Sequence, residues 1–103
     1  MSTVIYSRIN QSSASNAHQT SELLDFAKSK GLVVAKYFEE VSDGANTLEE
    51  RPVLKDLIAY ARENKIKNVI IHSRDRLSRD NDFISQIVGI FDSINIVLHV
   101  KSE

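Results

Sequence analysis

Cysteine is absent from this sequence of 103 residues, which contains one proline and three glycines. Without cysteine there can be no disulfides, thiolate-bound zinc, iron–sulfur clusters or cysteine nucleophiles, and the absence fits a reducing compartment. The glycines, Gly31, Gly44 and Gly89, form neither a GxGxxG fingerprint nor a GxxxxGK[ST] loop. The sequence therefore lacks the common glycine-rich devices for binding nucleotide phosphates.

Long apolar runs are also missing. The longest stretch without a polar residue or glycine covers residues 57–61, far short of the roughly 18 residues that a membrane-spanning helix needs. Residues 1–10 show no signal-peptide pattern. We therefore expect a cytoplasmic protein with no membrane partner.

Charge of one sign does not dominate either, because the formal net charge is −1. Acidic residues exceed basic ones in the first half of the chain, and basic residues exceed acidic ones after residue 50. Any anion-binding site must therefore depend on a few placed cations and not on a basic surface. With 42% hydrophobic and 26% charged residues, the composition is that of one globular domain over residues 1–103.

Hydrophobic periodicity predicts four strands, at residues 3–9, 32–38, 66–73 and 94–100. Three amphipathic helices lie between them. In the first helix, the spacing of Asn16 and Gln19 predicts a capping box, and Gly31 predicts the end. Its apolar face consists of Thr20, Leu23, Leu24 and Ala27. The second starts at Pro52, ends near Asn64 and buries Val53, Leu54, Leu57, Ile58 and Ala61; the third starts near Asp80 and buries Ile84, Ile87, Val88 and Phe91.

This alternation of strands and helices predicts an α/β fold: a mostly parallel four-stranded sheet with helices on both faces. Ligands of such sheets bind beyond the carboxyl ends of the strands. That rule selects three segments: the loop that begins at Asn10, an acidic loop over residues 39–50, and an arginine-rich turn over residues 74–80.

Arginine occurs at each of these three segments. Arg8 precedes the first, Arg51 ends the second, and Arg76 and Arg79 lie in the third. A guanidinium presents a planar fork of donors that matches two phosphate oxygens, so clustered arginines predict a phosphate or carboxylate ligand. Composition alone favours the other interpretation of the third segment, a solvated turn with weak salt bridges between Asp75, Asp80 and the arginines.

The histidines, at positions 18, 72 and 99, have no metal-ligand spacing. We therefore expect neither a metal site nor another cofactor.

Four segments resemble the catalytic domain of the serine recombinases, the resolvase and invertase family. Tyr6-Ser7-Arg8-Ile9 is similar to the family's Tyr-x-Arg-Val opening, and Gln19 with Leu23 to its first-helix pattern. The stretch from Ser42-Asp43-Gly44 to Arg51-Pro52-Val53-Leu54 is similar to its Ser-Gly…Arg-Pro-x-Leu pattern. Asp75-Arg76-Leu77-Ser78-Arg79-Asp80 reproduces the family's Asp-Arg-Leu-[Ser/Gly]-Arg-Asp signature without a mismatch.

The resemblance implies site-specific DNA cleavage and strand exchange, in which a serine hydroxyl attacks a phosphodiester to form a 5′-phosphoserine link and free a 3′-hydroxyl. By position, Arg8, Arg76 and Arg79 are expected to contact the scissile phosphate. Arg51 is expected to assist, and Gln19 and Asp75 to support the site. DNA is the implied partner, with a second copy of the chain or a full-length recombinase as further candidates.

The position of the nucleophile departs from the family pattern. Asn10 occupies it, and a carboxamide has no hydroxyl with which to form a phosphoester. Ser12 and Ser13 follow, but two residues of extended chain displace an atom by roughly 7 Å, so either serine could attack only if the loop folds back. We therefore expect impaired strand cleavage.

Family members continue after the fourth strand into a long helix and a DNA-reading domain, and these 103 residues hold neither. We expect this domain alone to bind DNA weakly and without sequence preference. Whether the family reaction here is resolution, inversion or integration stays open. Two other interpretations remain: a non-catalytic partner of a full-length recombinase, suggested by Asn10, and a flavodoxin-like or receiver-like domain, suggested only by the fold pattern.

Overall fold

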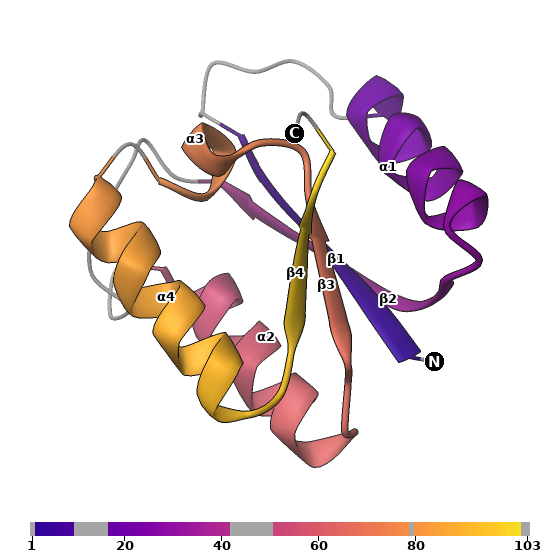
Figure 1. Cartoon of the computed structure of the whole chain (residues 1–103). Helices are drawn as coiled ribbons and strands as arrows, with labels where there is room; N and C mark the ends of the chain where they lie inside the picture. Colours follow the sequence, from indigo (N-terminus) through magenta and orange to yellow (C-terminus); the bar gives the residue numbers. More distant parts are fainter. Residues whose placement is uncertain (1, 10–16, 42–50, 79, 102–103) are drawn as a thin grey trace.

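Strand β1 (Ser2–Ile9) lies inside a four-stranded sheet in the computed structural model of the chain (Figure 1), which describes residues 2–9, 17–41, 51–78 and 80–101. The other strands are β2 (Val33–Val41), β3 (Asn68–Ile71) and β4 (Val97–Val100). Their order is β2-β1-β3-β4, and every pair is parallel. The predicted four-stranded parallel sheet is thus confirmed.

Strand β2 is longer than the sequence pattern predicts. Pairing with β1 continues through Ser7↔Glu39, Arg8↔Glu40 and Ile9↔Val41. The expectation that the acidic loop begins at residue 39 is therefore wrong, because Glu39, Glu40 and Val41 belong to the sheet. Strand β3 is shorter than predicted at both ends, and β4 is shorter than predicted at its start.

One helix, α1 (Ala17–Ser29), covers one face of the sheet (Figure 1). Leu23 and Ala27 pack against Ile5 and Ile70, whereas Leu24 is 44% exposed, so its prediction as a core residue is wrong. The helix ends as expected at Gly31, whose φ of 71° is the left-handed conformation that glycine adopts without strain. The Leu32 amide closes the end by donating to the Ala27 carbonyl at 2.9 Å. The predicted cap, Asn16, lies outside the described residues.

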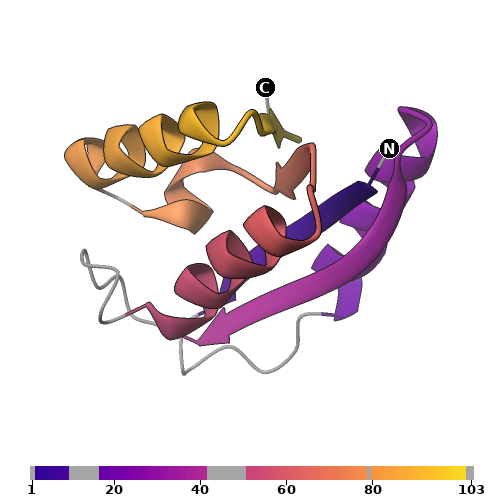
Figure 2. The ribbon, with the colours of Figure 1, turned by 90° about the horizontal axis from the view of Figure 1, so that it is seen from below.

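Two helices, α2 (Pro52–Glu63) and α4 (Asn81–Ser93), cover the opposite face (Figure 2). The predicted apolar faces are confirmed except at Val53 and Val88, which are only half-buried against the core, and Phe83 is a further core residue of α4 that the sequence analysis did not include. The residues of α2 and α4 that pack into the larger core cluster are buried: Leu54, Leu57, Ile58, Ala61, Phe83, Ile84, Ile87 and Phe91. Helices therefore lie on both faces of the sheet, as predicted.

A short helix, α3 (Arg74–Leu77), stands where the sequence predicts a turn. A backbone bond of the helical type, from the Ser78 amide to the Arg74 carbonyl at 3.1 Å, closes its end. The turn prediction is therefore corrected to one helical turn between β3 and α4.

Candidate active site

The carboxyl ends of the four parallel strands lie at one edge of the sheet. From β1 the chain crosses to β2 on one side, and from β2 it crosses back to β3 on the other side of β1. The direction of the strand order therefore changes between β1 and β3, which is where open α/β sheets bind ligands. Helix α3 follows β3 at this edge and lies beside β1 (Figure 1).

The segment that carries the arginine signature is held in place by its other residues. Leu77 is 1% exposed and belongs to the large core cluster. The buried Ser78 accepts a hydrogen bond from the Asp80 amide through its Oγ at 3.0 Å. Asp80 in turn caps α4, because its Oδ1 accepts from the amides of Asp82 at 2.9 Å and Phe83 at 3.4 Å. Every non-arginine position from Leu77 to Asp80 thus has a structural role.

The predicted site residues are spread over these elements. The backbone of Asp75 and Arg76 forms α3, and that of Gln19 lies in the first turns of α1, but their side chains are outside the described part of the structure. Asn10 and Arg79 lie outside the described residues altogether. The roles expected for these five residues stay predictions.

Arg8 is the second-last residue of β1 and is 6% exposed. Its register partner in β2 is Glu40, which is 2% exposed. Tyr6 lies two residues earlier on β1, so alternation along the strand places Tyr6 and Arg8 on the same face, the face that α2 and α4 cover.

Arg51 is fully buried and sits in a polar cluster that we call the Arg51 network: Tyr6, Glu40, Arg51 and the Leu77 carbonyl. Arg51 Nε donates to Glu40 Oε1 at 3.0 Å. Its Nη2 donates to the Tyr6 hydroxyl at 2.7 Å and to the Leu77 carbonyl at 2.6 Å. The network therefore joins β1, β2, the start of α2 and α3.

Glu40 completes the network with both carboxylate oxygens. Its Oε1 also accepts from the Tyr6 hydroxyl at 2.5 Å, and its Oε2 accepts from the Val53 amide in the first turn of α2 at 2.9 Å. Arg51, the N-cap residue, makes no side-chain capping bond, so Glu40 serves the free amide at the start of α2 in its place. The carboxylate also suits the positive end of the helix dipole.

Burial raises the pKa of the Tyr6 phenol well above its usual range. The hydrogen bond to Glu40 raises that pKa further, and the Arg51 guanidinium opposes the shift. The phenol therefore keeps its proton and acts as a donor to Glu40 and as an acceptor from Arg51.

Sequence reasoning missed Glu40 as a member of this site. The signal was the spacing of Phe38 and Glu40, which puts both on one face if the strand continues. A carboxylate beside a buried phenylalanine needs a buried cationic partner, and Arg51 is that partner.

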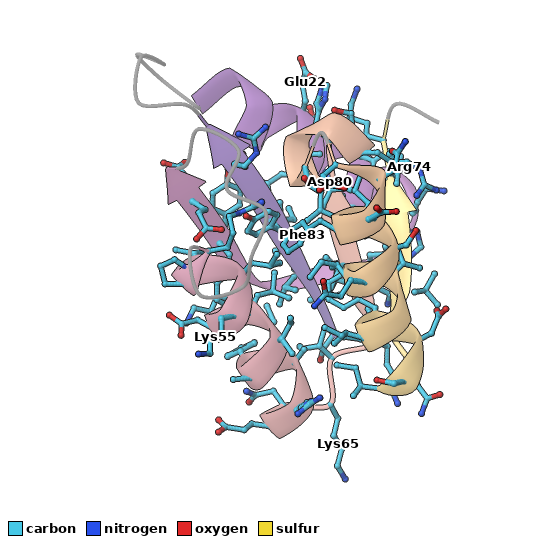
Figure 3. All side chains as sticks on the ribbon, turned by 90° about the vertical axis from the view of Figure 1, so that its left-hand side faces the viewer. Glu22, Lys55, Lys65, Arg74, Asp80 and Phe83 are labelled. Atoms are coloured by element: carbon cyan, nitrogen blue, oxygen red, sulfur yellow. The ribbon has the colours of Figure 1, made fainter. Side chains whose placement is uncertain are left out.

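A second contact at the same edge ties α1 to the ends of β3 and β4. Glu22 Oε2 lies 3.5 Å from His72 Nε2 and 3.6 Å from Lys101 Nζ. Figure 3 shows Glu22 and Arg74 at this end of the molecule, with Asp80 at the start of α4 and Lys65 at the opposite end. Among the described residues, no group of three or more acidic, histidine or cysteine side chains is placed to hold a metal ion.

A comparison with sequence models of protein families matches residues 3–103 to the family described as "Resolvase, N terminal domain". The chain belongs to this resolvase family. A search of the curated proteins finds no match, so the family model and the solved structures carry the assignment.

Solved structures agree with the resolvase assignment. The N-terminal catalytic domain of TP901-1 integrase is 26% identical, with a TM-score of 0.81 over 99% of this chain and 78% of that one. The C-terminal catalytic domain of ISC1926 TnpA, an IS607-like serine recombinase, is 25% identical, with a TM-score of 0.80 over 97% and 69%. A resolvase family site-specific recombinase from Streptococcus pneumoniae, 13% identical with a TM-score of 0.78 over 99% and 72%, shares the fold.

The resolvase domain has no helix, within the part of the chain that the structure describes, that is long and apolar enough to cross a membrane.

Proposed function

We propose that this resolvase-family domain binds a DNA phosphodiester through Arg8, Arg76 and Arg79, and that strand cleavage is impaired because Asn10 stands at the position of the nucleophile. The observation that supports the proposal most is the placement of the arginine signature. It matches the family pattern without a mismatch, and its helix α3 lies beside β1, the strand that carries Arg8, at the switch-point edge.

The arginines suit the charge that cleavage would create. In the family reaction, the serine hydroxyl gives up its proton as its oxygen bonds to phosphorus, the bond from phosphorus to the 3′ oxygen breaks, and that oxygen takes up a proton to leave as the 3′-hydroxyl. The pentavalent intermediate between these steps carries extra negative charge on its phosphoryl oxygens. By analogy with deletions of oxyanion-hole donors, each preorganised donor is worth about 3 to 4 kcal/mol. Gln19 and Asp75 are assigned to support the site, and no cofactor is required.

The test restores the missing hydroxyl. Asn10→Ser is incubated with supercoiled DNA, and covalent protein–DNA adducts are sought by denaturing electrophoresis, with Asn10→Ala and the unchanged chain as controls. We expect adducts from the serine variant alone. Adducts from the unchanged chain would indicate that Ser12 or Ser13 replaces the nucleophile. If no variant forms adducts, the interpretation that the site lacks only the nucleophilic hydroxyl is contradicted.

A second function is favoured by Asn10 itself. A domain that keeps the family fold but lacks the nucleophile can join a full-length recombinase as a non-catalytic subunit, or pair with a second copy of itself. Size-exclusion chromatography with light scattering of the chain, alone and mixed with a full-length serine recombinase, measures this. A mixed complex supports the regulatory function, and strictly monomeric behaviour in both samples contradicts it.

A further inference from the structure

We propose that Arg51 is a positioning residue, which holds α3 and its arginine signature against β1 through the Leu77 carbonyl, and that it does not itself contact the phosphate. The inference rests on the proposed function, because it concerns how that site is assembled. It differs from the role that the family resemblance implies, in which Arg51 assists at the phosphate.

The first argument is geometric. Arg51 is 0% exposed, and its described bonds go to Glu40, to Tyr6 and to the Leu77 carbonyl. Its guanidinium carbon also lies 5.9 Å from the centre of the Tyr6 ring and 5.5 Å from that of Phe83. The group is thus enclosed by β1, β2, α3 and α4.

The second argument is electrostatic. If Arg51 turned toward a phosphate, the Glu40 carboxylate would stay behind at 2% exposure without its cationic partner. Removing one partner of a buried ion pair is strongly destabilising, because it leaves an uncompensated buried charge. A phosphate contact would have to offset that cost as well as the lost bonds to Tyr6 and Leu77, so the buried arrangement is favoured.

The third argument concerns the size of α3. A helix of four residues is far below the length at which a helix is stable on its own. Its position must come from tertiary contacts, and two are formed by Leu77: its side chain packs in the core and its carbonyl accepts from Arg51. Arg76 precedes that carbonyl by one residue, so whatever fixes Leu77 fixes the backbone of Arg76.

Lysine cannot reproduce the contact, although it keeps the charge. The guanidinium uses separate nitrogens in fixed directions, Nε toward Glu40 and Nη2 toward Tyr6 and Leu77. An ammonium is a single point of charge without that fork. Arg51→Lys therefore removes the connection to α3 with little change in net charge.

Hydrogen exchange measures the connection without DNA. The reporter is the Ser78 amide, which closes α3. We expect Arg51→Lys to lower the protection of this amide by about tenfold or more relative to the amides of α4, the effect of losing one hydrogen bond from a charged donor. Arg62→Lys, on the exposed side of α2, should leave it unchanged, and Leu57→Ala should lower protection across the domain without singling out Ser78. Equal protection of Ser78 in Arg51→Lys and the unchanged chain would overturn the proposal.

A double-mutant cycle with DNA separates positioning from direct contact. Binding of a short fluorescent duplex is measured at low salt for Arg51→Lys, for Arg76→Ala/Arg79→Ala and for all three changes together. If Arg51 acts through α3, Arg51→Lys lowers the affinity for the duplex about tenfold in the otherwise unchanged chain. The same change then lowers the affinity less than about twofold when Arg76 and Arg79 are already absent. If Arg51 contacts the phosphate, its effect persists in full, which contradicts the proposal.

The two readouts also distinguish the possible failures. If the unchanged chain shows no duplex binding that depends on Arg76 and Arg79, the proposed function fails, while the exchange of Ser78 still reports on Arg51. Should Arg51→Lys not fold, the paired change Glu40→Gln/Arg51→Met removes both buried charges together, keeps an acceptor for the Val53 amide, and is measured in the same two experiments.

Discussion

Tyr6 and Glu40 show how single buried polar groups organise the candidate site. Each makes at least two described hydrogen bonds, and each is almost fully buried. Because such groups lose water on folding, their bonds stabilise the fold mainly by avoiding the penalty of an unpaired partner. The same bonds therefore set both the stability of the domain and the geometry at the end of β1.

Replacing Tyr6 by phenylalanine keeps the ring and removes the hydroxyl that bridges Glu40 and Arg51. We expect the free energy of unfolding to fall by about 1 to 3 kcal/mol, because a buried donor and acceptor lose a partner. Urea unfolding measures it. Tyr60→Phe, whose half-buried ring packs edge-on against Phe38, is the control. A Tyr6→Phe variant as stable as the parent would mean that the network contributes nothing to folding.

His99 predicts a pH dependence. Desolvation lowers the pKa of its imidazole, and the charge of Lys30 lowers it further; the neutral ring contacts Asn68 Oδ1 through Nε2 at 2.9 Å. The unfolded chain therefore takes up this proton more readily than the folded chain, so the contribution is fully present above about pH 6.5 and declines as the pH falls toward the lowered pKa. Urea unfolding at about pH 7.5 and pH 5.5 should show a smaller acid-induced loss for His99→Gln than for the parent. Identical losses would contradict this role.

Element boundaries with a local cause could be predicted from the sequence, whereas boundaries that are set by contacts between elements could not. Gly31 and Pro52 mark helix ends through backbone geometry alone, and both are where the sequence predicts them. The end of β2 depends on pairing with β1 and on Arg51, which no local pattern around Glu39 and Glu40 reveals. Helix α3 likewise receives a hydrogen bond at its Leu77 carbonyl from the distant Arg51, which no local pattern reveals, so the sequence predicts only a turn.

The start of α4 has a local cause that can be tested. Asp80 accepts two amide hydrogen bonds of the first turn, and replacing such a cap by alanine costs about 1 kcal/mol. Thermal or urea unfolding of Asp80→Ala should show this loss. Asp92→Ala, near the other end of α4, is the matched control and should not be destabilised, since a carboxylate there opposes the helix dipole. Equal effects of the two changes would argue against the cap.

The inward face of α2 gives a larger expected effect. Leu57 is 0% exposed in the main core cluster, so Leu57→Ala should lower the free energy of unfolding by about 2 to 5 kcal/mol. Leu24→Ala on α1 removes the same atoms from a side chain that is 44% exposed and should cost within about 1 kcal/mol. Denaturant titrations of both variants compare them directly. Similar losses would mean that the two faces are assigned incorrectly.

For the molecule as a whole, charge placement matters more than net charge. The net charge is −1, and Lys65 lies at the end opposite the candidate site (Figure 3). The fold class could be predicted from the sequence because strand and helix periodicity alternate along the chain. The site was predicted as a set of arginines at one edge, but the burial of Arg51 in a network with Tyr6 and Glu40 is a property of the assembled molecule.

This placement predicts how DNA binding depends on salt. Three arginine contacts to phosphates give a slope of about −3 for the logarithm of the affinity against the logarithm of the salt concentration. Duplexes of unrelated sequence should bind with similar affinity, because backbone contacts carry no sequence information. Fluorescence anisotropy across a salt series, with duplexes of unrelated sequence, measures the slope and the sequence dependence. Lys65→Gln, which removes one positive charge far from the candidate site, is the control and should leave the slope unchanged. A steep slope that Lys65→Gln reduces would place the DNA on another surface.

The sheet order also determines how the domain can form during synthesis. Strand β1 emerges first yet pairs on both sides, with β2 and later with β3, while β4 adds at the outer edge. A ribosome-bound chain can thus build the sheet outward from its oldest strand, but every pairing must wait for an intervening helix. Until β3 appears, one side of β1 exposes open backbone groups to other nascent chains.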